Sequence, residues 1–520
     1  MKGSAVRRFS RVVIGAAGAL LIVPLVVAAQ ALPASATGKA SAASGKLLVT
    51  TIARDGQSVQ TQVTVVLTSQ TAAPVFGYSG RAFSVPDGQY AVLAGISDPT
   101  SGTLAGAIVT VSGTGTTKVT LDGRQGKPVN VTLNGKQVTG SGNGQICALG
   151  GFASTSVFAA SNQLYIVPNS SKYLNFAYLA EGPGAILSGQ TSSGVPAGLT
   201  AHWSTSQLAK LSTTVRSGEQ PGSDTDYYIQ GGDAPGVGIT CQTFLYGQIA
   251  SGMPAPYAAT ELVSPGYWVV EASSDGGFYY LPQHFAAAHS YQYILYGAVW
   301  APTGYLAAVN DKSVLFNFPT LADALGNGDQ ASLMNSFALS LNGHTIATAK
   351  ATDYASNSSG FKVAIKTAGW YTLTDQATRY HPGISFPSTI LSPEVDLAYR
   401  FYASPSQNQA AEGFWTSFTP VGLNRSNQAA PRSTTTIAVR PYRGPANPGS
   451  PIPAEAVSKV QVWSSGDGVH WTALAVSHTS SGWTVQVHNP ASGYVYLRAQ
   501  VTGSRGDTST ETVHKAYAIS

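Results

Sequence analysis

The chain has 520 residues, which corresponds to about three or four domains of ordinary size. Only 10% of the residues are Asp, Glu, Lys or Arg, against about 25% in an average soluble protein, whereas 43% are hydrophobic. The 56 glycines and 29 prolines stay below the share that marks low-complexity disorder. With no complete catalytic motif present, this composition excludes a coiled coil, a disordered tail protein and a nucleic-acid-binding protein, and it predicts several buried cores.

The formal net charge of +5 belongs mainly to the first eleven residues. These contain four basic residues, Lys2, Arg7, Arg8 and Arg11, and the rest of the chain is close to neutral. The basic character therefore indicates a leader segment and no polyanionic partner.

The leader continues with an apolar run over residues 12–29 and the small residues Ala34-Ser35-Ala36. This order is typical of a secretory signal peptide, so residues 1–36 are predicted to be removed after Ala36. An uncleaved membrane anchor is the alternative, but it needs about 20 apolar residues and Pro24 interrupts this run. No later segment is long and apolar enough to span a bilayer, so we expect a secreted, extracellular protein.

The only two cysteines, Cys147 and Cys241, lie in the exported part. In an oxidising compartment they are expected to form one structural disulfide. A catalytic thiol is the alternative, but neither cysteine has a histidine nearby in sequence or a Cys-x-x-Cys partner.

Residues 44–138 show period-two alternation separated by turn signals. Val63, Val65 and Leu67 share one face of a half-buried strand. Asn134-Gly135 is a two-residue hairpin signal. We predict a β-sandwich over this range.

Residues 146–305 are rich in aromatic residues and have a less regular pattern. Short strands are expected near residues 267–270 and 291–299, and Thr205 is expected to cap a short helix carrying Leu208 and Leu211. This range is predicted to be an aromatic-rich irregular β domain.

Regular alternation returns in residues 311–422, with a hairpin signal at Asn342-Gly343, and predicts a second β-sandwich. After a proline-rich connector, residues 430–520 contain four regular strands, as in an immunoglobulin-like or fibronectin-like sandwich. No internal repeat of fixed period is found. The predicted fold class is all-β, with several β-sandwich domains.

Several stretches carry a family resemblance: the turn at residues 463–471, the strands at 339–343 and 370–373, and Pro86-Asp87-Gly88-Gln89-Tyr90. In this order they resemble the non-catalytic C-terminal accessory extension of large secreted bacterial subtilisin-like peptidases. The resemblance implies a transthyretin-like or carboxypeptidase-regulatory-like sandwich at residues 44–138, and a peptidase-accessory role.

The catalytic domain of that family is absent from this sequence. A subtilisin-like enzyme needs a serine, a histidine base and an aspartate that orients the histidine, and none of the three family motifs occurs. The nearest fragment, Asn342-Gly343-His344-Thr345, lies in a predicted hairpin. We therefore predict no catalytic residues and no enzyme activity.

No metal or cofactor site is predicted. His284 and His289 are five residues apart, a spacing that suits neither a helix nor a strand for binding one metal. The densest acidic group, Glu219, Asp224 and Asp226, is interpreted as a solvated loop, with a weak calcium contact as the alternative. A pair of carboxylates from distant strands, as in glycosidases, stays open.

Two surface features have competing interpretations. Arg505-Gly506-Asp507 is interpreted as an ordinary turn and not as a cell-adhesion motif. The aromatic residues between Cys147 and Pro302 either fill a core or form a binding surface, for example for sugar rings.

These features together predict a secreted, non-enzymatic, multi-domain β-sandwich protein with an extracellular binding or peptidase-accessory role. A carbohydrate or cell-wall binding protein is the first alternative, and a hydrolase with an unrecognised site is the second. The expected partner is an extracellular protein or a polysaccharide, and no nucleic acid; the sequence leaves its identity and the oligomeric state open.

Overall fold

The computed structural model describes residues 44–98, 100–160, 163–217, 224–231, 241, 245–254, 256–274, 277–303, 308–310, 312–316, 320–324, 328–329, 333–351, 361–380, 385–406, 413–442, 456–480 and 482–520. The predicted signal peptide lies outside these residues. Ser44–Ser520 form one compact unit. Within the described residues, no helix is long and apolar enough to cross a membrane.

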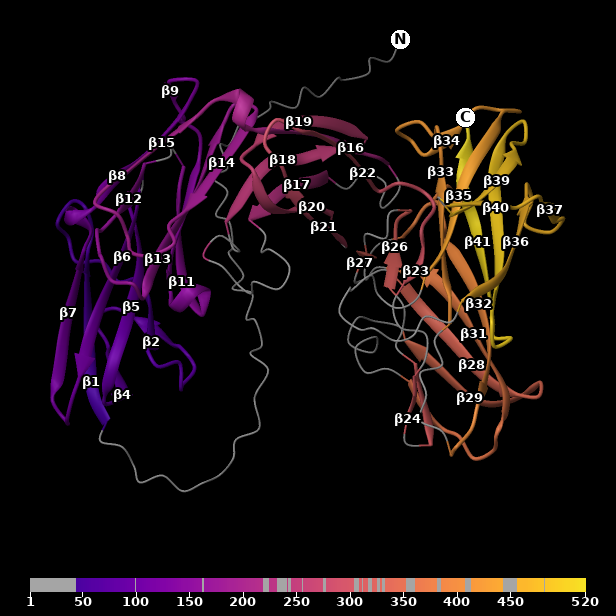
Figure 1. Ribbon diagram of the computed structural model, residues 1–520, viewed down its shortest axis with the longest axis horizontal. Coiled ribbons are helices and arrows are strands. Elements are labelled where there is room, and N and C mark those ends of the chain that lie inside the picture. The colour runs from indigo at the N-terminus through magenta and orange to yellow at the C-terminus, as the bar shows by residue number, and fades with distance from the viewer. Residues whose placement is uncertain are drawn as a thin grey trace, which may run out of the picture. The chain divides into compact units, whose positions relative to one another are not determined.

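Regular structure in the described residues is β-strand apart from three short 3-10 helices (Figure 1). These are η1 (Gly123–Gln125), η2 (Leu149–Gly151) and η3 (Thr205–Gln207). The predicted all-β fold class is confirmed.

The N-terminal part of the chain forms four sheets, which we number in the order in which their cores connect them. Sheet one has the order β4 (Ala82–Pro86), β1 (Ser44–Ile52), β7 (Thr116–Asp122). Sheet two has the order β15 (Leu199–Trp203), β8 (Lys127–Leu133), β12 (Leu164–Ile166), β6 (Gly102–Val111), β5 (Gly88–Ser97), β2 (Gln62–Leu67), β3 (Val75–Tyr78), with β9 (Lys136–Gln137) paired to β8.

Sheet three has the order β11 (Ala153–Ala159), β10 (Gly142–Ala148), β13 (Leu174–Gly182), β14 (Ala185–Gln190), β19 (Tyr257–Val263), β16 (Ala209–Val215), β22 (Ser290–Leu295). Sheet four has the order β18 (Tyr246–Pro254), β17 (Asp224–Gly231), β20 (Gly266–Ser274), β21 (Gly277–Phe285).

Sheets two and three are buried on both faces. In β5, Val92 and Ala94 belong to the core shared with sheet one, whereas Ala91 and Leu93 belong to the core shared with sheet three. The sequence of a strand with two buried faces is a continuous apolar run and does not alternate between apolar and polar residues. Four β-sheets can therefore stack on three successive cores.

The third core lies between sheets three and four. Leu179 of β13 packs in the same cluster as Trp268 of β20, and both side chains are almost fully buried. The Cys147–Cys241 disulfide belongs to this cluster and joins β10 to the connection between β17 and β18. The predicted disulfide is thus present, and it ties sheet three to the segment that carries sheet four.

The range 146–305 is more regular than its sequence predicts. It supplies most of sheet three and all of sheet four, and its strands β12 and β15 extend sheet two beyond residue 138. The ranges 44–138 and 146–305 therefore share one sheet. The irregular pattern in the sequence arises because strands with two buried faces lose the polar positions on which alternation depends.

The helix expected after Thr205 is only the 3-10 turn η3. Ser204, and not Thr205, caps it: the Ser204 backbone N–H donates to Gln207 Oε1 over 2.8 Å in a capping box. Extended backbone resumes at Leu208, and Leu211 lies in β16. The helix does not continue because residues 209–215 alternate buried and less buried positions, which favours a strand.

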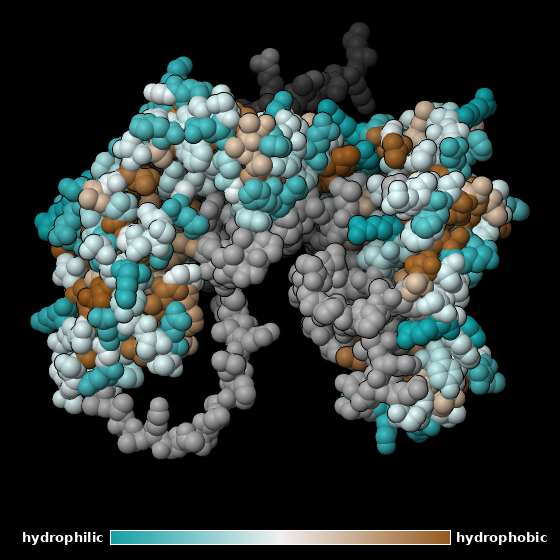
Figure 2. Space-filling model, viewed as in Figure 1, coloured by the Kyte–Doolittle hydropathy of each residue, from teal (hydrophilic) through white to brown (hydrophobic). Residues whose placement is uncertain are grey.

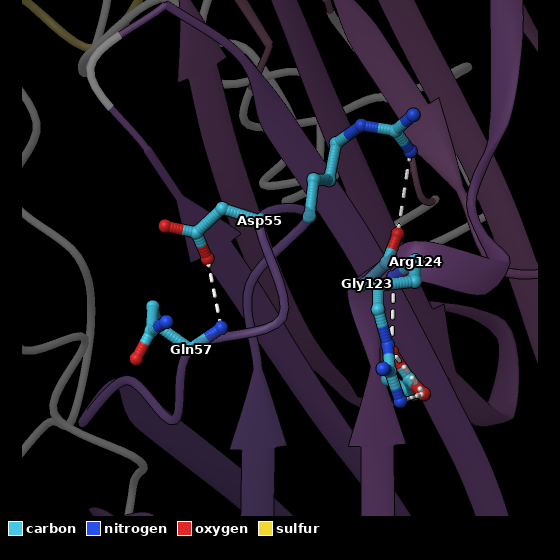
Figure 3. A network of polar contacts seen from close by, with 6 residues as sticks. Asp55, Gln57, Gly123 and Arg124 are labelled. Carbon is cyan, nitrogen blue, oxygen red and sulfur yellow. Dashed lines mark hydrogen bonds and ion pairs between the residues drawn. The ribbon is translucent and has the colours of Figure 1, made fainter.

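A polar network joins sheets one and two beside η1 (Figure 3). Nη1 of Arg54 donates to the carbonyl oxygen of Gly123 over 3.3 Å, and the guanidinium lies 3.5 Å from the ring centroid of Tyr165 in β12. Asp55 Oδ1 accepts from the backbone N–H of Gln57 over 2.8 Å and closes the turn.

The C-terminal part contains two sandwiches and a small extra sheet. The extra sheet has the order β23 (Ala301–Thr303), β26 (Thr320–Ala322), β27 (Gly328–Asp329). The first sandwich combines β24 (Ala308–Asn310), β25 (Ser313–Phe316), β30 (Phe361–Ala364) with β29 (His344–Ala351), β28 (Leu333–Leu341), β31 (Gly369–Arg379), β32 (Glu394–Ala403).

The second sandwich combines β33 (Trp415–Pro420), β35 (Thr434–Tyr442), β39 (Gly482–His488), β38 (Ser477–Thr479) with β41 (Thr508–Ile519), β40 (Gly493–Gly503), β36 (Val457–Ser465), β37 (Thr472–Leu474); β34 (Gln428–Ala429) pairs with β41. These two sheets have the strand orders A-B-E-D and G-F-C-C′ of an immunoglobulin domain. The immunoglobulin-like prediction is confirmed in topology, but the first strand, β33, precedes residue 430.

The two sandwiches are joined through their last strands. β32 pairs antiparallel with β41 from Val395↔Val513 to Arg400↔Thr508, so two four-stranded sheets become one continuous sheet, which we call the joined sheet. Figure 1 shows β29, β28, β31 and β32 continuing into β41, β40 and β36. The predicted ranges 311–422 and 430–520 therefore also share a sheet.

The joined sheet reveals an internal similarity that no fixed-period search detects. β31 and β40 are the same strand of the two sandwiches, and residues 369–378 and 493–502 carry Gly, Leu, Gln and Thr at equivalent positions. With only two copies and loops of different length, this similarity leaves no periodic signal.

Both predicted two-residue hairpins are confirmed. Asn134 and Gly135 have φ of 49° and 76°, and Asn342 and Gly343 have φ of 49° and 82°. Positive φ at both central residues is the requirement of the turn that matches the twist of a hairpin.

The visible surface consists mostly of hydrophilic and intermediate residues. Figure 2 shows mostly pale and teal residues, with hydrophobic residues in small groups. This agrees with a chain in which only 10% of residues are charged.

Asn427 connects three segments that are far apart in the sequence. Its Oδ1 accepts from Arg216 Nη1 (3.2 Å) and from the backbone N–H of Ala298 (3.0 Å). Its Nδ2 donates to the carbonyl oxygens of Ser217 (2.6 Å) and Tyr296 (2.9 Å). The residue is fully buried, so these four bonds replace water at a junction between β16, β22 and the second sandwich.

We expect Asn427→Ala to lower the free energy of unfolding by roughly 3 kcal/mol, because it leaves buried backbone groups and one guanidinium nitrogen without their partner. Chemical denaturation followed by fluorescence measures this loss. Ser426→Ala, at the exposed neighbouring position, is the control. Equal stability of the two variants would contradict the assignment of Asn427 as a junction.

We expect the native chain to contain no thiol that can be alkylated before reduction, and two afterwards. Replacing both cysteines by serine should lower the free energy of unfolding by about 4 kcal/mol, because the disulfide closes a sequence interval of 94 residues. Intact-mass measurement with and without reductant, followed by denaturation of both forms, checks the two statements. Alkylation of the unreduced native chain would contradict the first.

Candidate functional site

The joined sheet has one face packed on cores and one open face. In β31, Tyr371 and Leu373 are buried, whereas Thr372, Thr374 and Gln376 alternate with them on the other side. The same alternation continues through β32 and β40. Hydroxyl, amide and aromatic side chains therefore line an uninterrupted face that belongs to both sandwiches.

A groove of about 810 Å³ lies on this open face. Its side-chain walls come from five neighbouring strands, β29, β28, β31, β32 and β41: Thr348, Lys350, Ser336, Ala338, Thr374, Gln376, Asp396, Ala398, Thr510 and Thr512. Because β32 and β41 belong to different sandwiches, the groove exists only where these two strands pair.

Two carboxylates and an imidazole meet beside the groove. His514 Nε2 lies 2.8 Å from Asp396 Oδ2 and 3.8 Å from Glu394 Oε1. The hydrogen bond to Asp396 raises the pKa of His514 above its ordinary value. One donor atom from each residue lies within 4.8 Å of the others, so this set could hold a divalent cation.

Aromatic side chains flank the groove on the same face. Trp370 and Tyr402 contact each other edge to face, with ring centroids 5.8 Å apart, and the Arg400 guanidinium covers Trp370 at 3.9 Å. In the second sandwich, Arg498 lies 4.1 Å over the ring of Trp471. Arg498 Nε also donates to Thr512 Oγ1 over 3.0 Å, which places this stack beside the groove wall.

Under the groove, buried side chains of β41 connect the joined sheet to the chain at β33. Ser509 Oγ accepts from the backbone N–H of Phe414 (2.8 Å), and Glu511 Oε2 accepts from that of Thr416 (3.1 Å). Burial raises the pKa of Glu511 to about 8, although the Thr416 N–H opposes the shift. Glu511 is therefore un-ionised at neutral pH, and it attaches β33 to the underside of the joined sheet.

A second buried carboxyl group, Asp375, lies in the neighbouring region of the core face. Burial raises its pKa to about 7; the Ser336 N–H, which donates to Oδ1 over 3.0 Å, lowers it, and the charge of Asp396 raises it. Leu397 separates Asp375 from Glu511 in the strand register. Both acids are buried, so they do not form the accessible carboxylate pair of a glycosidase.

The turn interpretation of Arg505-Gly506-Asp507 fits the structure. The tripeptide lies in the hairpin between β40 and β41, and the Asp507 side chain is only 7% exposed and 3.5 Å from Arg505. The carboxylate is thus turned inward and is not presented to a partner.

The structure does not bring the remaining sequence candidates together. His284 is exposed on β21 beside Tyr267, whereas His289 lies in the following turn and bonds to the carbonyl oxygen of Ala287. Asn342 to Thr345 form the predicted hairpin and its exposed end. Glu219 and the side chains of Asp224 and Asp226 lie outside the described residues.

The aromatic residues between Cys147 and Pro302 mainly fill cores. The described side chains that are buried include Tyr178, Tyr227, Tyr257, Trp268, Phe285, Tyr293, Tyr296 and Trp300. Trp203 is partly buried, and its Nε1 lies 3.4 Å from the Tyr178 hydroxyl. The core interpretation therefore accounts for these buried residues, whereas Phe152 and Phe158 of the same range are exposed.

Sequence reasoning missed the groove and its neighbours. The spacing of Glu394 and Asp396 in an alternating strand could have placed both acids on one face. No sequence signal connects them to His514, because that contact depends on the pairing of β32 with β41.

No family model matches the chain, and no curated protein matches it. Solved structures give only weak likenesses. Three N-terminal domains of the outer capsid protein Hoc of bacteriophage RB49 are 11% identical, with 65% of this chain and 91% of that chain covered and a TM-score of 0.16. A tetra-tandem repeat of a large adhesion protein is 9% identical, with coverages of 92% and 100% and a TM-score of 0.14. A streptococcal ancillary pilin is 11% identical, with coverages of 49% and 98% and a TM-score of 0.11. At these scores the likenesses carry no argument about function.

We expect the stability of the protein to fall as the pH rises from about 5 to 9. The folded-state pKa of Glu511 lies above its ordinary value, so the folded state holds a proton that the unfolded state has lost, and the loss reaches up to about 4 kcal/mol. Glu511→Gln keeps an acceptor for the Thr416 N–H and removes the titration. Its stability should therefore depend less on pH, as denaturation at a series of pH values will show; parallel curves for parent and variant would contradict the shift.

Proposed function

We propose that this chain is an extracellular, non-enzymatic binding protein and that the open face of the joined sheet is its binding surface. The observation that carries this proposal is the groove across β32 and β41. It is built from side chains of two sandwiches on one continuous sheet, so its walls are positioned by main-chain hydrogen bonds. A surface positioned in this way needs little ordering when it binds a ligand.

The chemistry of the groove supports binding over catalysis. Its described lining has hydroxyl groups at Ser336, Thr348, Thr374, Thr510 and Thr512 and an amide at Gln376. Its carboxyl groups are those of Asp375, which is buried and has its pKa raised to about 7, and of Asp396 on the open face. That carboxylate is already hydrogen-bonded to His514. No serine or threonine of the described lining has a histidine as a base in the arrangement that a hydrolase triad requires.

Export is supported by the leader sequence and by the disulfide. Cys147 and Cys241 are paired, and a structural disulfide persists in oxidising compartments. A peptidase-accessory role would use the same surface with a protein partner, so the experiment below includes proteins as well as polysaccharides.

Thr374→Arg should abolish binding by filling the groove with a long cationic side chain. Thr436→Arg, on an exposed position of β35 outside the groove, is the matched control. Immobilised parent and variants are exposed separately to the protein and the polysaccharide fractions of the medium and envelope of a secreting culture. We expect Thr374→Arg to reduce retention of the bound component about tenfold and Thr436→Arg to leave it unchanged.

Two results would contradict the proposal. Equal retention by the parent and by folded Thr374→Arg would show that the groove does not bind the retained component. Chemical conversion of the retained component that is abolished by Asp396→Asn would show that the protein is an enzyme.

A further inference from the structure

We infer that the ligand of the open face is an uncharged polysaccharide chain that lies along β31 and β32, from the groove to Tyr402. This inference rests on the proposed function, because it names the ligand class of the same surface. Three features of the face lead to it: the charge of the groove, the kind of side chains that line it, and the position of the nearest exposed aromatic ring.

The charge of the groove favours a neutral ligand. On its open face, the groove has one charged residue of each sign, Lys350 and Asp396, while Asp375 of the lining is buried towards the core. Beside the groove, the guanidinium groups of Arg400 and Arg498, stacked on Trp370 and Trp471, carry positive charge, and Glu394 carries negative charge. Both signs are mixed on this face, so neither a polyanion nor a polycation would meet a continuous run of the opposite charge.

The lining suits a polyhydroxylated ligand. Ser336, Thr348, Thr374, Thr510 and Thr512 offer hydroxyl groups that both donate and accept. Gln376 adds an amide with two donors and an acceptor. Such groups match sugar hydroxyls without selecting for charge.

A peptide fits this groove less well. A helical peptide needs an apolar groove for its anchors, but the small side chains Ala338 and Ala398 are the apolar groups that reach the open face here. An extended peptide gains affinity by pairing with the edge of a sheet, whereas four of the five groove strands, β28, β31, β32 and β41, are paired on both sides; β29 alone lies at an edge.

Tyr402 provides an aromatic platform beyond the groove. It lies four residues after Ala398 on the same face of β32, about 13 Å along the strand, and it is 42% exposed. Trp370 holds its ring by an edge-to-face contact. A ligand that contacts both Gln376 and Tyr402 must therefore be longer than one sugar ring, and its rings must follow the strand direction.

The test measures affinity of the full secreted chain for soluble neutral polysaccharides, namely a β-glucan, a mannan and a xylan. Polygalacturonate and chitosan serve as anionic and cationic comparisons. Affinity electrophoresis identifies the bound polymer, and calorimetry with its oligosaccharides of increasing length follows. We expect one neutral polymer to bind, with affinity that rises with chain length and then levels off.

Two variants and two matched controls locate the ligand. Gln376→Ala and Tyr402→Ala should each weaken binding about tenfold. Gln461→Ala, on β36 outside the groove, and Tyr78→Ala, an exposed tyrosine of β3, should leave it unchanged.

Binding of the charged polymers with a strong salt dependence would overturn the inference. Unchanged affinity in both Gln376→Ala and Tyr402→Ala would also overturn it. If the component whose retention depends on Thr374 is a protein, the proposed function stands and the polysaccharide inference fails. If no retention depends on Thr374, both fail.

Discussion

The antiparallel pairing of β32 with β41 is the interaction on which the C-terminal part of the structure depends. Each strand is the last of its sandwich and would otherwise present a row of unpaired backbone groups at the edge of a sheet. Their pairing satisfies both edges and makes one sheet from two. The groove, the cluster of Glu394, Asp396 and His514, and the aromatic flanks are all placed relative to one another by this pairing.

On the underside of the joined sheet, β41 also binds the chain at β33. Ser509 and Glu511 accept backbone hydrogen bonds from the chain at β33, so side chains replace the strand partner that β33 lacks on that side. A carboxyl group can take this role only in its neutral form, because its charged form would be buried without a counter-ion. The open face and the pH dependence of stability therefore both depend on β41.

In the N-terminal part, β-sheets are stacked, and two of them are buried on both faces. Sheets two and three have no exposed face over much of their area, so the aromatic residues of this part are needed as core. Asn427 then connects this part to the second sandwich by four hydrogen bonds, beside the hydrophobic contacts that Ala298 and Val299 make in the core of that sandwich. Buried aromatic residues fill the cores of the stacked sheets, although Phe76, Tyr78, Phe152 and Phe158 of this part are exposed, as is Tyr402 on the joined sheet.

The sequence by itself determined the elements whose signal is local. The all-β class, the hairpins at Asn134-Gly135 and Asn342-Gly343, and the pairing of the only two cysteines follow from alternation, turn chemistry and composition. The stacking of four sheets and the joining of two sandwiches were decided only in the tertiary structure. A strand's sequence shows which of its faces are apolar, but it does not show which strand lies beside it. His514 reaches Asp396 across 118 residues of chain only because β41 pairs with β32, and a contact of that kind leaves no mark in the local pattern of either strand.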